Sequence, residues 1–143
     1  YFTDAQARTG IFKLLPDISP FTITFYAGVS SHPVTNDTNT HFTLSGNGNP
    51  FIDIMFNYEG GGRLIVNGSF CPGAVFNLGD WLYIEIKNID WTNNNFDVWL
   101  NGTEVCNEVD FEAPANFIDR VDFYNGDPSG NGQSWIDELR FMD

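Results

Sequence analysis

Apolar and polar residues alternate strictly in two neighbouring segments, 81–87 and 96–100, and a polar stretch at 88–95 separates them. The positions that fall on the apolar side are Leu82, Ile84, Ile86, Phe96, Val98 and Leu100. Successive strand residues point to opposite faces, so this pattern predicts an antiparallel hairpin that buries these side chains. The same register turns Tyr83 and Trp99 outward, whereas a slip by one residue would bury both rings.

Further strands are predicted wherever short apolar or alternating segments end in Gly, Asn or Pro. They cover residues 21–26, 40–44, 51–58, 63–66, 103–106, 118–124 and 135–141. In the first of them Phe21, Ile23 and Phe25 share the inward side, and in the last Trp135 and Asp137 share the apolar side. No segment keeps a helical period over three turns. The chain is therefore predicted to be all-β, a two-layer antiparallel β-sandwich of the jelly-roll type, with one domain over residues 1–143.

The composition narrows the classes of partner. At 143 residues and 42% hydrophobic, the chain has enough apolar mass for one core. Its formal net charge of −13 argues against nucleic acid and against an anionic membrane surface, because both require Lys and Arg. No run approaches the roughly 18 apolar residues of a membrane-spanning helix. Because the sequence starts at Tyr1 and not at Met, we expect it to be a piece of a larger protein.

The two cysteines, Cys71 and Cys106, fit one disulfide between neighbouring strands, and two buried free thiols are the alternative. A zinc site is not expected, because these cysteines are far apart in sequence and the chain has only two histidines.

Large rings beside acids and amides on a face that avoids the core predict a surface for a flat, hydroxylated ligand. A pyranose stacks its apolar face on Trp or Tyr, and carboxylates, amides and guanidinium groups hold its hydroxyls. On the outer face of the central sheet we expect Tyr83, Trp99 and Tyr124 as platforms, Asp97, Arg120, Asp122 and Glu85 as polar contacts, and Arg63 if its strand joins the same sheet. The alternative is that these rings pack beneath loops. We expect Trp81 and Trp135 to be structural.

Four stretches resemble the laminin-G-like, concanavalin-A-like jelly rolls. They are Ser19–Phe25, Gly79–Trp81, Phe96–Gly102 and Trp135–Phe141, in the order and spacing of that superfamily. The resemblance implies a non-catalytic carbohydrate-binding module of a secreted bacterial protein. Such a module tethers a polysaccharide-degrading enzyme to a plant or algal glycan and works as a monomer linked to the catalytic domain. Net charge favours a neutral polymer, whereas clustering of Arg63, Arg120 and Lys87 would favour an anionic one.

The resemblance also implies a structural Ca²⁺ near Asp137, with backbone carbonyls of the N-terminal segment as further ligands. A salt bridge or a backbone hydrogen bond would satisfy an inward Asp137 equally well. Asn125, Asp127 and Asn131 form a second candidate in a loop.

Two other functions stay open. A laminin-G-like adhesion module would bind a protein partner through the same kind of surface. A small glycoside hydrolase or polysaccharide lyase is less favoured, because retaining hydrolysis needs two carboxylates roughly 5 Å apart. The nearest pairs, Asp119 with Asp122 and Asp137 with Glu138, point to opposite sides of their strands. The glycoside hydrolase and lyase strand motifs of the superfamily are also missing.

Overall fold

The computed structural model describes residues 2–3, 10–29, 39–57, 61–126 and 133–143, and it folds them into two six-stranded antiparallel sheets. Sheet A contains, in spatial order, β1 (Phe2–Thr3), β12 (Gln133–Met142), β3 (Thr22–Val29), β8 (Trp81–Asp90), β9 (Asn95–Leu100) and β10 (Thr103–Asp110). Sheet B contains β2 (Gly10–Ile18), β11 (Ile118–Asn125), β4 (Thr40–Gly46), β5 (Asn49–Asn57), β6 (Arg63–Val66) and β7 (Ser69–Val75). The predicted jelly-roll β-sandwich is confirmed.

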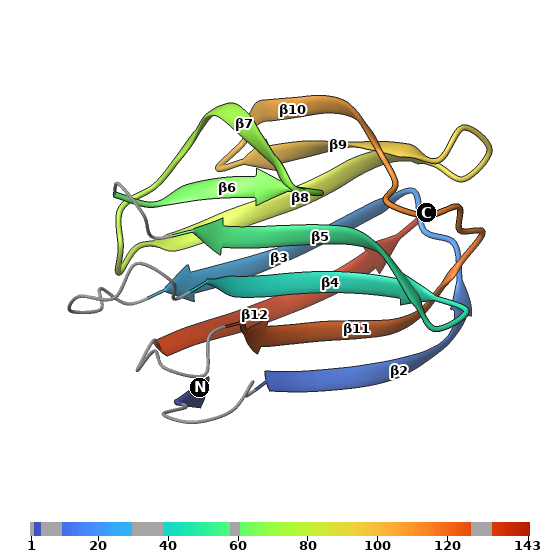
Figure 1. Ribbon diagram of the computed structural model, residues 1–143, viewed down its shortest axis with the longest axis horizontal. Helices are drawn as coiled ribbons and strands as arrows, with labels where there is room; N and C mark the ends of the chain where they lie inside the picture. Colours follow the sequence, from blue (N-terminus) through green and yellow to red (C-terminus); the bar gives the residue numbers. More distant parts are fainter. Residues whose placement is uncertain (1, 4–9, 30–38, 58–60, 127–132) are drawn as a thin grey trace.

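The two sheets lie face to face, and the chain crosses between them repeatedly (Figure 1). Strands β4 to β7 stay together in sheet B, and β8 to β10 stay together in sheet A. In contrast, β3 and β12 belong to sheet A although each is next in sequence to a strand of sheet B. Within the described residues there is no helix that is long and apolar enough to cross a membrane.

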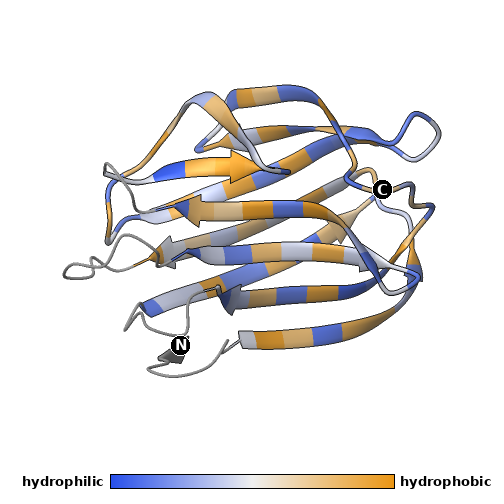
Figure 2. Ribbon diagram, viewed as in Figure 1, coloured by the Kyte–Doolittle hydropathy of each residue, from blue (hydrophilic) through white to orange (hydrophobic). Residues whose placement is uncertain are grey.

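The core lies between the sheets and comes from alternate residues of both. Figure 2 shows this alternation as orange and blue bands along the strands. Phe25 of sheet A stacks on Phe42 of sheet B with ring centroids 4.1 Å apart, and both rings are fully buried. The predicted parity of the hairpin is confirmed, since Leu82, Ile84 and Ile86 are buried. The inward orientation predicted for Phe21 is wrong, because this residue precedes β3 and is 53% exposed.

A disulfide joins Cys71 to Cys106, with the two Cα atoms 5.4 Å apart. The sequence allowed either a disulfide or two free thiols, and the structure contains the disulfide. Cys71 lies on β7 and Cys106 on β10, which are edge strands of different sheets. The disulfide thus fastens the two layers together along one edge of the sandwich.

A β-bulge in β12 overturns the prediction that Trp135 and Asp137 face the core. Four residues of β12, from Asp137 to Arg140, lie opposite only three residues of β3, from Tyr26 to Thr24, and Glu138 has a φ of +51°. The extra residue changes the parity within the strand. Trp135 and Asp137 consequently lie on the outer face with Arg140, whereas Leu139 and Phe141 pack against the core.

Besides the two-residue β1, two described strands, β2 and β7, were not predicted. Both are edge strands of sheet B, and both contain proline, which is Pro16 in β2 and Pro72 in β7. An edge strand tolerates proline and needs no strict alternation, so its pattern is weak. Tyr58, the last residue of one predicted strand, lies outside the described residues.

Candidate functional site

The eight predicted ligand residues do not form one surface. Tyr83, Glu85, Asp97 and Trp99 lie on the outer face of sheet A, whereas Arg63, Arg120, Asp122 and Tyr124 belong to sheet B. The core separates the two groups, so each face must be judged by its own geometry. Lys87 is on sheet A, and β4 and β5 separate the strands of Arg63 and Arg120. The three cations proposed for an anionic polymer therefore do not cluster.

On sheet A, the ring of Trp99 is covered by a neighbouring side chain. The Lys87 ammonium lies 4.2 Å from the centre of this ring and 2.7 Å from a carboxylate oxygen of Glu85, which is nearly buried. Asp97 accepts hydrogen bonds from the Asn88 side chain and from the Glu108 amide. The polar groups around Trp99 thus bind one another, and Lys87 covers the ring, so Trp99 does not offer an open face for stacking a ligand.

Tyr83 belongs to a group of rings farther along the same face, which we call the sheet A aromatic surface: Tyr26, Tyr83, Trp81 and Trp135. Tyr26 and Tyr83 are cross-strand partners with ring centroids 4.8 Å apart. Trp81 and Trp135 meet edge to face at 5.8 Å. Trp81 is 52% exposed, so its predicted structural role is not supported by burial.

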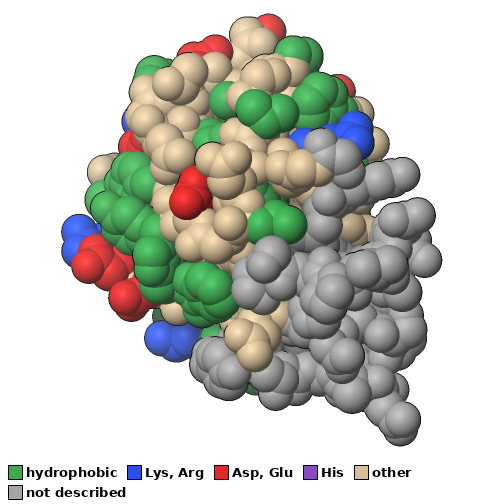
Figure 3. Space-filling model, turned by 90° about the vertical axis from the view of Figure 1, so that its left-hand side faces the viewer, with side chains coloured by type: hydrophobic (Ala, Val, Ile, Leu, Met, Phe, Trp, Pro, Cys, Tyr) green, Lys and Arg blue, Asp and Glu red, His purple; other side chains and the backbone are tan. Residues whose placement is uncertain are grey.

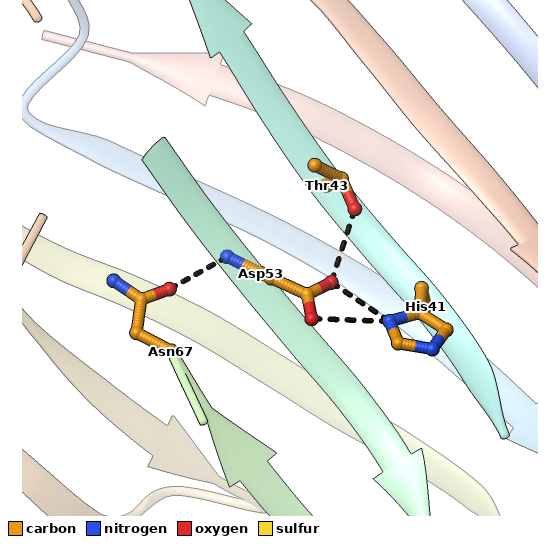
Figure 4. Close-up of polar contacts among 4 residues, drawn as sticks. All are labelled: His41, Thr43, Asp53 and Asn67. Carbon is orange, nitrogen blue, oxygen red and sulfur yellow. Dashed lines mark hydrogen bonds and ion pairs between the residues drawn. The ribbon is translucent and has the colours of Figure 1, made fainter. Parts of the chain in front are cut away.

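On sheet B, Asp53 organises a polar network across β4, β5 and the turn after β6 (Figure 4). Thr43 Oγ1 donates to Asp53 Oδ1 over 3.0 Å, and His41 Nδ1 lies 3.0 Å from both carboxylate oxygens. A carboxylate only accepts, so Nδ1 carries the hydrogen of this contact. The Asp53 amide donates to Asn67 Oδ1 over 2.7 Å. The network fixes the His41 ring in one orientation.

Tyr124 and Glu112 border this network. The ring of Tyr124 stacks on His41 with centroids 5.0 Å apart and planes 6° from parallel. The pKa of Glu112 is raised above its usual range, first by burial and second by the negative charge of Asp53. The protonated form of Glu112 is therefore favoured beside the Asp53 carboxylate.

Arg120 and Asp122 form a two-point ion pair on β11. Arg120 Nε donates over 2.7 Å and an Nη over 2.5 Å to the two carboxylate oxygens of Asp122, and this hydrogen bonding raises the pKa of Arg120. The guanidinium lies 4.6 Å from the ring centre of Phe12 on β2. Such a pair holds a rigid array of donors and acceptors in a fixed plane.

The Arg120–Asp122 pair and Tyr124 line a cavity of about 400 Å³ on the outer face of sheet B. Its polar lining comes from Thr43, Ser45, Arg120, Asp122 and Tyr124, and its apolar lining includes Phe12 and Pro50. Three predicted residues, Arg120, Asp122 and Tyr124, are therefore brought together. Arg63 does not line this cavity; its guanidinium lies 5.8 Å from the ring centre of Phe70.

Sequence reasoning missed His41, Thr43, Ser45 and Asp53. A signal was present, because polar residues at 41, 43 and 45 alternate with the buried Phe42 and Leu44. The antiparallel pairing of Thr43 with Asp53 then brings their side chains together on one face. The missing information was the register between the two strands.

The predicted calcium ligand, Asp137, is exposed, and one of its carboxylate oxygens accepts the Glu138 amide. Within the part of the chain that the structure describes, no three His, Cys, Asp or Glu side chains gather as a metal site. Asp127 and Asn131 of the loop candidate, and residues 4–9 of the N-terminal segment, lie outside the described residues. Calcium stays a prediction, which melting with and without a chelator tests.

The architecture is that of the jelly-roll β-sandwich proteins. No protein-family model and no curated protein sequence matches the chain. Among solved structures, a sialidase matches 88% of this chain with a TM-score of 0.70 and 14% identity, and the match spans 11% of the sialidase chain. A tetrameric galectin from the ball sponge Cinachyrella matches 94% of this chain and 100% of its own, with a TM-score of 0.65 and 8% identity.

A homodimeric agglutinin from chicken liver, CG-16, matches over the same shares, 94% and 100%, with a TM-score of 0.60 and 10% identity. At these identities the similarity shows the fold alone. The laminin-G-like type expected from the sequence stays a prediction.

Proposed function

We propose that this domain is a non-catalytic carbohydrate-binding module that holds a glycan in the cavity on the outer face of sheet B. The observation that carries the proposal is the lining of this cavity, in which a rigid Arg120–Asp122 pair faces hydroxyl groups and apolar surface. The galectins and the agglutinin of the same fold support a sugar ligand.

The chemistry of the cavity suits a sugar ring. Arg120 donates to sugar hydroxyls, Asp122 accepts from them, and the hydroxyls of Thr43 and Ser45 do either. Phe12 and Pro50 offer apolar contact to the ring carbons. Binding consists of hydrogen bonds and apolar contact, and no covalent step is involved.

Charge favours a neutral sugar. The domain carries a net charge of −13, and Asp53, which accepts a hydrogen bond from the cavity residue Thr43, adds negative charge beside the cavity. An acidic sugar would meet this field with Arg120 already paired to Asp122. We therefore infer a neutral plant or algal polysaccharide as the ligand class.

The wider role we propose is to tether a polysaccharide-degrading enzyme to its substrate, in a secreted or cell-surface bacterial protein. The sialidase match supports a modular role, since this fold forms only a small part of that longer chain. A laminin-G-like adhesion module that binds a protein is the alternative, and a small hydrolase or lyase is a weaker one. Release of reducing sugar by the purified domain would favour the hydrolase, and an absorbing product would favour the lyase.

Affinity electrophoresis in gels containing neutral β-glucan, xylan or galactomannan tests the proposal. We expect one of these polymers to retard the domain and Arg120→Ala to weaken binding about tenfold or more, because a charged hydrogen-bonding group contributes about 1.5–3 kcal/mol. Arg63→Ala is the matched control on the same sheet. Equal retardation of Arg120→Ala and the unchanged protein, with both folded by circular dichroism, would refute the site.

A further inference from the structure

The sheet A aromatic surface lies on the opposite side of the sandwich from the proposed sugar cavity. Trp81 is 52% and Tyr26 37% exposed, and each packs on a half-buried ring of the same face, Trp81 on Trp135 and Tyr26 on Tyr83. In Figure 3, which views one end of the sandwich, hydrophobic side chains gather along one side. Exposed rings in contact with one another form a broad platform, which single scattered apolar side chains do not.

A glycine in β3 makes this platform possible. Gly28 is the cross-strand neighbour of both Trp135 and Trp81, so it lies between the two indoles. A Cβ atom at Gly28 would overlap the Trp135 indole. The indole therefore lies across the backbone of β3, and its edge-to-face contact with Trp81 depends on the missing side chain.

The β12 bulge contributes to the same arrangement. It places Trp135 and Asp137 on the outer face, and Asp137 is the cross-strand neighbour of Tyr26. A carboxylate thus stands beside the rings, where it can accept hydrogen bonds from hydroxyl groups that project from a stacked ligand.

The charges around the platform select the class of ligand. Among the described residues, the cations of this face are already paired, Lys87 with Glu85 and Arg140 with Glu138. Asp137 adds a further negative charge, so an acidic sugar would be repelled. A second copy of the domain would also bring its own net charge of −13 against this face. A neutral pyranose chain avoids both penalties and offers apolar ring faces to the indoles.

We propose that the sheet A aromatic surface is a second glycan-binding site, so that one monomeric domain binds two polysaccharide chains at once and cross-links them. The two sites face away from each other across the two sheets, which prevents both from holding one short oligosaccharide. The inference goes beyond tethering, because a single-site module binds a polymer without joining chains.

The test compares polymer cross-linking with simple binding, using the neutral polysaccharide that retards the domain. We expect the unchanged protein, shown to be monomeric by light scattering, to make that polymer turbid. Trp81→Ala should still bind, about 3–10-fold more weakly, and Arg120→Ala should still bind, weakened about tenfold or more, but neither should cause turbidity. The double variant should not bind. Phe70→Ala, which removes an exposed ring outside both sites, is the matched control.

The two proposals fail in different ways. Loss of all binding in Arg120→Ala alone, or full turbidity with Trp81→Ala, refutes the second site. A dimer in solution that Trp81→Ala converts to a monomer also refutes it, because this face would then be a protein interface. If Trp81→Ala abolishes binding and Arg120→Ala does not, the sheet B cavity is refuted and the aromatic surface alone is the site. Retardation by none of the polymers refutes both.

Discussion

The two outer faces of the sandwich rest on one core but present different chemistry. On sheet B, the outward side chains of β4, β5 and β11 include acids, hydroxyls, one imidazole and one guanidinium, several of them joined by hydrogen bonds. On sheet A, the outward side chains of β3, β8 and β12 include four rings that pack as two pairs. The comparison teaches that alternation fixes which residues point outward, while the residues chosen for those positions decide what each face can bind.

Removing the disulfide should produce the largest effect on the molecule as a whole. The double variant Cys71→Ala/Cys106→Ala should lose about 2–5 kcal/mol of unfolding free energy, since the bond closes a loop of 35 residues and joins the two sheets. Urea unfolding measures the loss. Both faces should weaken together; an unchanged midpoint would show that the edge contact of β7 with β10 suffices without the bond.

Gly28→Ala should damage only the sheet A face. The new methyl group forces the Trp135 indole off β3, and overpacking of this kind costs about 1–3 kcal/mol. Near-ultraviolet circular dichroism should change because the Trp81–Trp135 contact is lost, and the affinity of the sheet B cavity should not. A spectrum identical to that of the unchanged protein would mean that the indole does not lie over Gly28.

Asp53→Ala should damage only the sheet B face. It removes the acceptor shared by His41 and Thr43 and should cost about 1–2 kcal/mol, measured by urea unfolding. Asp137→Ala, at an exposed position on sheet A, is the control and should change stability by less than about 0.5 kcal/mol. Equal losses in the two variants would contradict the network.

Glu112→Gln should produce the smallest effect, and its sign depends on pH. The raised pKa of Glu112 means that the folded state favours the protonated carboxyl over the ionised one. Ionisation therefore costs stability, fully above the folded pKa and not at all well below the usual value of 4.5. The variant should melt higher than the unchanged protein at pH 7 and equally near pH 3. The same gain at both pH values would exclude a charge effect. Exposed Glu104→Gln serves as the control.

The sequence predicts which face of its sheet a side chain lies on, but it does not predict which of the two sheets a strand joins. The period of two correctly turned Tyr83 and Trp99 away from the core and buried Ile84 and Val98 between them. It carries no information on which sheet a strand joins, because either sheet buries an apolar side equally well. Tyr124 was therefore expected beside Tyr83, although β11 belongs to the other layer.

The errors within strands have local causes. The bulge at Glu138 places a positive φ at a residue type that rarely adopts one, so no residue pattern predicts that Trp135 lies on the outer face. The Asp53 network was missed because cross-strand neighbours become visible only when the register of β4 and β5 is known.

The bulge in the last strand makes one residue of this protein dispensable for its surface pattern. Deleting Glu138 would restore regular alternation and leave Trp135 and Asp137 on the outer face, with Leu139 and Phe141 toward the core. Deleting Ile136 instead would move Trp135 to an inward position, so a lineage that lost that codon would keep its fold class but lose a platform, without any substitution among the rings themselves. Comparisons of related sequences should therefore count gaps in this strand as carefully as they count conserved tryptophans.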